Sequence, residues 1–118
     1  MRRILICEDE RDAQEHLKML LQRKEYEVFG VYDGKDAIDK AKELYPDLIL
    51  LDIRMPKIDG LEVAREIRKI NKTTKIIFIT AFASQQIEQE ASQYDISEYI
   101  VKPANPEDIV KAVESALK

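Results

Sequence analysis

The sequence contains only one cysteine, Cys7, so the chain cannot form an internal disulfide. Glycine and proline are scarce, at 3 and 4 residues, and 45% of the residues are hydrophobic. This composition excludes a disordered or low-complexity protein. No apolar run approaches the roughly 20 residues that cross a bilayer. The 118 residues suit one domain with its own hydrophobic core, which we expect to span 1–118.

Basic charge is also in short supply. Lys and Arg number 19 against 23 Asp and Glu, which gives a net charge of −4. A domain that grips a phosphate backbone needs a basic stripe, so we expect no direct nucleic acid binding. The apolar run at residues 4–7 ends at Glu8 and is shorter than the roughly 7–15 residues of a signal-peptide core. We therefore expect a cytoplasmic protein that does not bind membranes.

Two kinds of segment alternate along the chain. Short apolar runs bounded by turn-forming residues predict strands at residues 3–7, 26–32, 48–51, 75–80 and 98–101. Apolar residues at helical spacing predict helices between them. The helices are expected from Asp9 or Asp12 to about residue 25, from the capping residue Asp33 to before Pro46, after the turn at residues 57–60, over about residues 84–94, and from Pro106 onward.

Each predicted helix has an apolar face that should turn inward. These faces comprise Ala13, Leu17, Leu20 and Leu21; Ala37, Ile38, Ala41 and Leu44; Leu61, Ala64, Ile67 and Ile70; Ile87, Ala91 and Tyr94; and Ile109, Val110, Val113 and Leu117. The fourth helix is otherwise polar and should be loosely held. His16, the only histidine, falls off its helix's apolar face and is expected on the surface.

Five strand–helix pairs with short connections predict a parallel sheet covered by helices on both faces. The third and fourth strands are the most apolar and should be central, whereas the strand at residues 26–32 should lie at an edge. The predicted fold is α/β and flavodoxin-like, a (βα)5 doubly wound parallel sheet with strand order 2-1-3-4-5.

Polar residues follow the strands where they end. Glu8 and Asp9 follow the first strand, Asp52 the third, Thr80 closes the fourth, and Lys102 follows the fifth. Neighbouring strand ends lie roughly 5 Å apart, so the three carboxylates should crowd one cleft. Crowded carboxylates repel one another unless a cation lies between them. Hard oxygen ligands suit Mg²⁺. The two charges of Mg²⁺ and the single charge of Lys102 would together balance the three carboxylates.

A carboxylate can also attack phosphorus and form an aspartyl phosphate. Phosphorylation removes one negative charge and adds nearly two. A balanced site would then become net negative by about one, and the surrounding loops could respond to that change.

Five motifs in order carry a resemblance: Glu8-Asp9, Asp52 with Arg54-Met55-Pro56, Asp59-Gly60, Thr80-Ala81, and Tyr99 with Lys102-Pro103. Together they resemble the receiver domain of two-component response regulators, of the stand-alone, single-domain type, over the whole chain.

The resemblance implies a phospho-accepting switch rather than an enzyme with an external substrate. Asp52 would accept a phosphoryl group from phosphohistidine on a sensor histidine kinase or a histidine phosphotransfer protein. Mg²⁺ would be held by Glu8, Asp9, Asp52 and the main-chain carbonyl of Arg54. A downstream effector protein would bind the phosphorylated form. The protein itself would be a monomer or a weak, phosphorylation-dependent dimer.

The resemblance also implies a switch. Lys102 would contact a phosphoryl oxygen, the Thr80 hydroxyl would swing to another, and Tyr99 would turn inward behind Thr80. A cis bond before Pro103 is implied as well. Taken alone, Thr80 could be an ordinary strand-end hydroxyl, Tyr99 a static packing residue and Lys102 a solvated lysine.

Two departures have local consequences. Asp95-Ile96 stands where receivers often have Gly-Ala, so Asp95 would adopt a left-handed conformation at some cost. Arg54 and Phe82, each two residues beyond a site residue, are large. We expect them to hinder the water that attacks the acyl phosphate.

Three other functions compete. One is a receiver that no longer accepts phosphate and serves only as a binding module, which the intact set of acids and Lys102 argues against. The other two belong to different classes of protein. A flavodoxin-type electron carrier would cradle a flavin phosphate after its first strand, where Glu8-Asp9-Glu10 would repel it. A phosphatase with an aspartyl intermediate would need a general acid and a substrate cap, and neither is apparent. A colourless protein and a lack of phosphomonoester turnover would exclude these two classes.

Overall fold

The computed structural model describes residues 1–118, along which strands and helices alternate. The strands are β1 (Arg3–Cys7), β2 (Glu27–Val31), β3 (Leu48–Asp52), β4 (Lys75–Thr80) and β5 (Glu98–Val101). The helices are α1 (Arg11–Arg23), α2 (Gly34–Leu44), α3 (Gly60–Ile70), α4 (Gln85–Ala91), the 3-10 helix η1 (Ser92–Tyr94) and α5 (Pro106–Ala116). No helix combines the length and the hydrophobicity that a membrane span requires.

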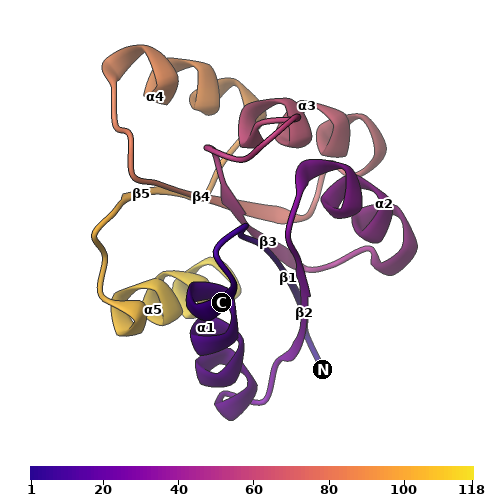
Figure 1. Cartoon of the computed structure of the whole chain (residues 1–118). Helices are drawn as coiled ribbons and strands as arrows, with labels where there is room; N and C mark the ends of the chain where they lie inside the picture. The colour runs from indigo at the N-terminus through magenta and orange to yellow at the C-terminus, as the bar shows by residue number, and fades with distance from the viewer.

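The five strands form one parallel sheet in the order β2-β1-β3-β4-β5, which confirms the predicted fold class and strand order. Helices α1 and α5 cover one face of the sheet, and α2, α3 and α4 cover the other (Figure 1). β2 lies at an edge, as predicted, and is one residue shorter at each end than expected. Because all strands are parallel, their carboxyl ends meet at one edge of the sheet.

Strand β3 is buried on both faces. Ile49 and Leu51 belong to the hydrophobic cluster on the α2–α3 side of the sheet, whereas Leu48 and Leu50 belong to the cluster on the α1–α5 side. None of these four side chains is more than 1% exposed. Their continuous apolar sequence predicted this position, because a strand covered on both faces has no polar side. The strand therefore carries Asp52 from the core to the carboxyl edge.

The start of α1 differs from the prediction that Asp9 or Asp12 caps this helix. Helix α1 begins at Arg11, with Glu10 as N-cap and no side-chain capping bond. Asp12 lies within the first turn, and the carboxylate of Asp9 belongs to an acidic cluster instead. The cap predicted at Asp33 is confirmed, since its side chain accepts a hydrogen bond from the amide of Asp36.

The buried residues of α1 also differ from the prediction. They are Gln14, Leu17 and Leu21, while Ala13 and Leu20 are only partly buried. A glutamine can occupy this face because its amide group finds hydrogen-bond partners there.

The buried face of α3 is shifted from the predicted one. Val63 joins Ala64 and Ile67 in the core, and Leu61 and Ile70 lie at its margin, partly exposed. These margin positions still contact solvent because Val63, one turn before Ile67, is at the centre of the packed face.

Helix α4 has the sparse apolar face that its sequence predicts. Only Ala91 is fully buried, and Ile87 and Tyr94 pack partly against the core. The helix is capped at its start by Ser84, whose hydroxyl accepts from the amide of Ile87. The segment ends at Asp95 with a φ of 56°, the left-handed conformation expected there.

Candidate functional site

Two neighbouring strands bring acids to the carboxyl edge of the sheet. Cys7, the last residue of β1, is aligned with Leu51 of β3, so Glu8 and Asp52 follow at the same level. Both side chains are only 6% exposed. The carboxylates are therefore held by the regular pairing of two buried strands rather than by a flexible loop.

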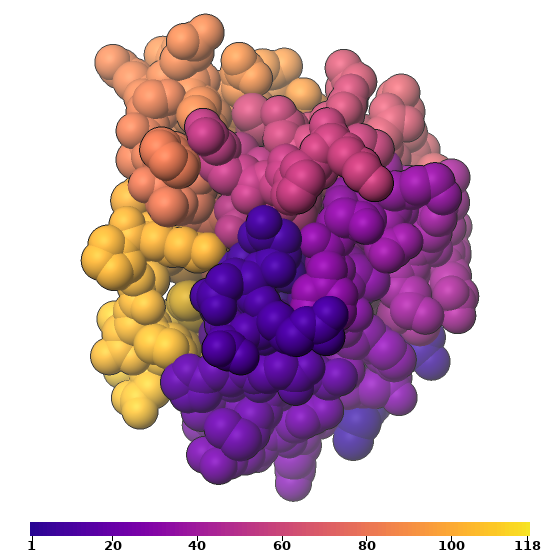
Figure 2. All heavy atoms as spheres, viewed as in Figure 1, coloured from indigo at the N-terminus to yellow at the C-terminus, as the bar shows by residue number.

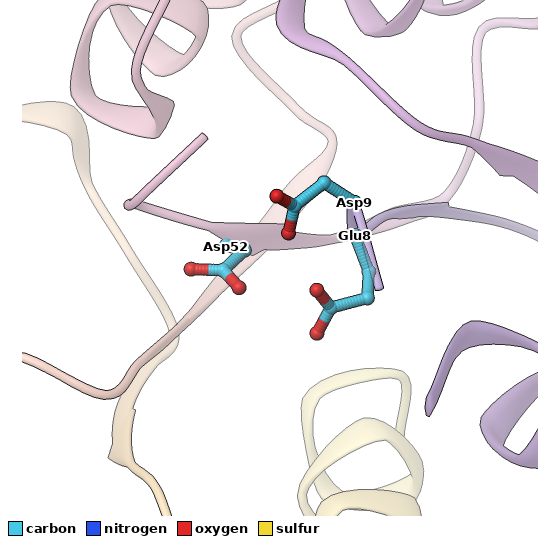
Figure 3. A group of neighbouring side chains, drawn as sticks. All are labelled: Glu8, Asp9 and Asp52. Carbon is cyan, nitrogen blue, oxygen red and sulfur yellow. The ribbon is translucent and has the colours of Figure 1, made fainter. Parts of the chain in front are cut away.

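The carboxylates of Glu8, Asp9 and Asp52 form one cluster (Figure 3). One oxygen from each lies within 4.8 Å of the other two. Asp9 is exposed, whereas Glu8 and Asp52 are buried. Three negative charges at this separation repel one another unless cations compensate them.

Lys102 supplies one of the compensating charges. Its Nζ donates to Glu8 Oε1 at 2.7 Å and to Asp52 Oδ2 at 3.0 Å. Burial by itself would lower the pKa of Lys102, but the hydrogen bonds to these two carboxylates and their charges outweigh it, and the pKa is raised. Lys102 follows β5 and precedes a cis bond to Pro103, as the resemblance implied.

Main-chain amides satisfy other carboxylate oxygens. The amide of Arg54 donates to Asp52 Oδ1 at 3.0 Å, and the amide of Glu10 donates to Glu8 Oε2 at 3.1 Å. Hydrogen bonds to a charged carboxylate favour the ionised form. Each buried acid therefore has a main-chain hydrogen-bond partner in addition to Lys102.

Gly60 fits tightly against the chain that leaves β3. A Cβ at this position would collide with the carbonyl oxygen of Asp52 and would lie 2.8 Å from the Cα of Ile53. The amide of Gly60 donates to the Ile53 carbonyl at 2.9 Å. Lack of space, rather than an unusual backbone angle, thus requires glycine in the predicted Asp59-Gly60 turn.

The donor set fits a hard divalent cation. Glu8, Asp9 and Asp52 carry three negative charges and offer oxygens only, and Lys102 neutralises just one of the charges. Mg²⁺ is bound in proteins by one or two carboxylates together with waters and phosphate oxygens. The cluster is therefore suited to Mg²⁺, as the sequence predicted.

Thr80 and Tyr99 lie on adjacent strands but are not level with each other. Thr80 is fully buried, and its hydroxyl accepts from the amide of Phe82 at 3.1 Å. Tyr99 is aligned with Phe78, and its buried hydroxyl has no hydrogen-bond partner. Burial, followed by the charge of Glu88, raises the pKa of Tyr99.

Arg54 and Phe82 lie against each other beside the site. The guanidinium carbon of Arg54 is 4.1 Å from the centre of the Phe82 ring, within the range of a cation–π interaction. Both side chains are exposed. The sequence predicted that both large residues lie close to the site but did not predict that they stack.

Gln14 and Cys7 are neighbours of the site that sequence reasoning did not connect to it. Gln14 donates to the main-chain carbonyl of Glu8, and its burial could have been inferred from its three-residue spacing to Leu17. Cys7 lies directly before Glu8 with its Sγ 3.3 Å from Met55 Sδ. Burial, then the nearby carboxylates, raise the pKa of this thiol, so it stays protonated at neutral pH.

A cavity opens beside the acidic cluster, between the start of α1 and the segment that leads into α5 (Figure 2). Its volume is about 600 Å³, and Glu8 and Lys102 lie in its wall. Ala13, Leu17 and Ala104 form part of its apolar lining, and the exposed His16 lies at its side.

Comparison with known proteins identifies the family to which this sheet and its acidic cluster belong. The family model described as "Response regulator receiver domain" matches residues 4–114. The chain belongs to this family, the receiver domains of two-component response regulators.

Particular relatives are similar over the whole chain. "Response regulator ArlR" of Staphylococcus aureus is 39% identical over 118 residues, which are 100% of this chain and 53% of ArlR. The chain thus spans about half the length of the curated relatives it matches.

Solved structures agree on the fold. Response regulator protein TrrA from Thermotoga maritima, crystallised in complex with Mg²⁺-BeF, is 40% identical with a TM-score of 0.87, over 99% of this chain and 100% of that one. A CheY-like receiver domain protein from Methanospirillum hungatei is 27% identical with a TM-score of 0.95, over 99% of this chain and 94% of that one.

Proposed function

We propose that the chain is a phospho-accepting switch of a two-component system or phosphorelay, with Asp52 as the acceptor. The observation that carries this proposal is the contact of one buried carboxylate with a lysine inside an acidic cluster. Asp52 is 6% exposed, it contacts Lys102, and it lies beside Glu8 and Asp9. A carboxylate in such a site is a nucleophile toward phosphorus.

The donor is phosphohistidine on a sensor histidine kinase or a histidine phosphotransfer protein. A carboxylate oxygen of Asp52 forms a bond to phosphorus while the phosphorus–nitrogen bond breaks, and the imidazole nitrogen leaves with the bonding electrons. Lys102 already holds Asp52 Oδ2 and is placed to contact a phosphoryl oxygen. The Thr80 hydroxyl, now bound to the Phe82 main chain, would contact another.

Glu8, Asp9, Asp52 and the main-chain carbonyl of Arg54 would hold Mg²⁺. When bound, the ion supplies positive charge that stabilises the oxygens of the transferring group. The main-chain carbonyl belongs to the loop that already donates an amide to Asp52 Oδ1. That bond keeps the loop after β3 close to the acceptor.

The protein catalyses its own phosphorylation and dephosphorylation and does not turn over external substrates. In dephosphorylation, a water oxygen forms a bond to phosphorus while the bond to Asp52 breaks, and inorganic phosphate is released. The reacting carboxylate belongs to the protein itself, so each cycle returns the same chain to its starting state.

The phosphorylated site acts on a bistable part of the fold. Attachment of the group makes the site more negative by about one charge. Thr80 and Tyr99 are the proposed switch residues, because the buried Tyr99 hydroxyl has no partner in this state and can gain one in another. Helix α4 is the proposed element that moves in response to the switch residues, because Ala91 is its only buried residue.

Partner proteins use separate surfaces. The upstream phosphoryl donor docks on α1 near Asp12, Ala13 and His16 and on the loop at residues 103–105. Ala13 and His16, together with Pro103 and Ala104 of that loop, line the cavity beside Lys102. A downstream effector reads the altered face. The domain spans 1–118, acts in the cytoplasm as a monomer or weak phosphorylation-dependent dimer, and does not itself bind nucleic acid or membranes.

Phosphorylation with a small-molecule donor tests the acceptor. Wild-type protein incubated with acetyl phosphate and Mg²⁺ should gain the mass of one phosphoryl group, and Asp52→Ala should gain none. Asp39→Asn is the matched control, because Asp39 is an exposed aspartate of α2 outside the acidic cluster and should label like wild type. Labelling of Asp52→Ala equal to that of wild type would refute the proposal.

A further inference from the structure

Gln14 is the one buried polar residue of α1. It is 1% exposed and shares the inward face with Leu17 and Leu21. A buried amide costs free energy unless it is hydrogen-bonded. Its Nε2 donates to the main-chain carbonyl of Val31 at 2.6 Å and to that of Glu8 at 3.1 Å. The side chain therefore joins the ends of β1 and β2 at the edge where the acidic cluster lies.

Gly30 makes the space that Gln14 fills. A Cβ at Gly30 would collide with Gln14 Oε1 and would lie 2.7 Å from its Cδ. No glycine in the chain has a positive φ, so Gly30 is not needed for an unusual backbone conformation. Glycine weakens a strand, and within one it often marks a close approach of another group. At Gly30 that group is the amide of Gln14.

The contact fixes the main chain of Glu8 from both sides. The amide of Glu8 donates to the carbonyl of Val31 at 3.2 Å, and the carbonyl of Glu8 accepts from Gln14. The carboxylate of Glu8 then bonds Lys102 and the amide of Glu10. An acid of the cluster thus projects from a backbone segment whose amide and carbonyl both have defined partners.

We propose that Gln14 is a positioning residue for the divalent-cation site and acts through the main chain of Glu8. Gly30 contributes by leaving space for the Gln14 amide. The inference rests on the proposed cation-binding role of the acidic cluster, but not on phosphorylation. Groups behind a metal ligand orient it, and their loss weakens metal binding. A purely structural Gln14 would stabilise the packing of α1 without affecting the cation.

Cation affinity and stability, measured separately, distinguish these roles. Gln14→Met keeps the length and volume of the side chain but cannot donate, and Gly30→Ala displaces the amide. Each should weaken Mg²⁺ binding about 10-fold in calorimetric titration of the unphosphorylated protein, the lower end of the range for lost outer-shell partners. The free energy of unfolding in urea with EDTA is measured on the same variants.

Leu21→Val is the matched control. Leu21 is fully buried on the same face of α1, about two turns further along the helix than Gln14, so this variant should lose stability and keep the wild-type dissociation constant for Mg²⁺. An unchanged dissociation constant in Gln14→Met would overturn the inference, as would an equal loss of affinity in Leu21→Val. A wild-type protein that binds no Mg²⁺ would overturn it too.

The double variant tests whether Gly30 acts through Gln14. If Gly30 acts only by making room for Gln14, then Gln14→Met and Gly30→Ala combined should weaken binding by less than the product of the single effects. Full multiplication of the two effects would show that they act independently. Acetyl phosphate labelling separates the proposals, because a wild type that binds Mg²⁺ but fails to label contradicts the phospho-accepting function and leaves the role of Gln14 intact.

Discussion

Asp52 is nearly fully buried, which is rare for an aspartate unless its carboxylate is paired. The preceding apolar strand buries it, and Lys102 and the amide of Arg54 provide its hydrogen bonds. A buried carboxylate without such partners would be driven to its neutral form. The local sequence around Asp52 predicted the burial, but the partner from β5 is 50 residues distant in the chain.

The stacked pair of Arg54 and Phe82 should control how long the phosphoryl group persists. The two side chains lie in contact, and we expect them to hinder the approach of the attacking water. Arg54→Ala and Phe82→Ala should each speed dephosphorylation several-fold, because each opens the approach to phosphorus. Decay of the labelled protein, followed by mass spectrometry after removal of acetyl phosphate, measures the rate.

Lys57→Ala provides the comparison for this pair. Lys57 is an exposed cation in the same loop as Arg54, and its replacement should leave the dephosphorylation rate unchanged. Rates equal to wild type in both Arg54→Ala and Phe82→Ala would contradict the proposed shielding.

At the scale of elements, α4 is held unequally at its two ends. Near its C-terminal end, the Arg68 side chain of α3 donates to the carbonyls of Tyr94 at 2.6 Å and Asp95 at 2.9 Å. At its start the helix has a single serine cap, and Gln85 and Gln86 are exposed. Motion of α4 should therefore be greatest at the end that faces the Thr80 loop.

Hydrogen exchange across α4 tests this unequal anchoring. With beryllofluoride and Mg²⁺, backbone exchange should change at the start of α4 more than at η1, because the Arg68 contacts hold the far end. Arg68→Ala should speed exchange at η1 and lower the free energy of unfolding by about 1.5–3 kcal/mol, the range for hydrogen bonds to a charged group.

Arg65→Ala is the control on the same helix. Arg65 makes only exposed ion pairs with Glu62 and Glu66, which contribute little to stability. Uniform exchange along α4, with no response to beryllofluoride, would contradict its assignment as the mobile element.

For the molecule as a whole, we expect the acidic cluster to favour cation binding while it lowers the stability of the cation-free protein. Asp9 is exposed and adds a third negative charge to two buried ones. Asp9→Asn should raise the urea midpoint in EDTA, because it relieves repulsion. The same variant should gain less stability than wild type from millimolar Mg²⁺, because a ligand that binds the folded state stabilises it according to its affinity.

Urea titrations of wild type and Asp9→Asn, with and without Mg²⁺, measure both effects on stability. Asp39→Asn serves as the control, since Asp39 lies on α2 in an exposed ion pair with Lys35 and outside the acidic cluster. If Asp9→Asn and wild type gained equal stability from Mg²⁺, Asp9 would not contribute to cation binding.

The sequence predicted the fold closely where the apolar pattern was strong. The continuous run in β3 and the alternation of strands and helices are local signals, and the strand order follows from them through general rules of chain connection. The start of α1 was predicted wrongly because the two aspartates near it have the chemistry of a helix cap, but Asp9 lies in the acidic cluster and Asp12 lies inside the first turn. Asp9 was predicted in both roles from the sequence, and only the structure shows that it does not cap the helix.

The residue types and their order along the chain determined the doubly wound sheet and the arrival of Glu8, Asp9, Asp52 and Lys102 at one edge. Only the tertiary structure decided how α1 contributes, since Gln14 is buried because of a missing side chain at Gly30 on another element. It also decided the stacking of Arg54 on Phe82 and the contacts of Arg68 at the end of η1. These contacts depend on the distance between elements, which packing sets and periodicity does not encode.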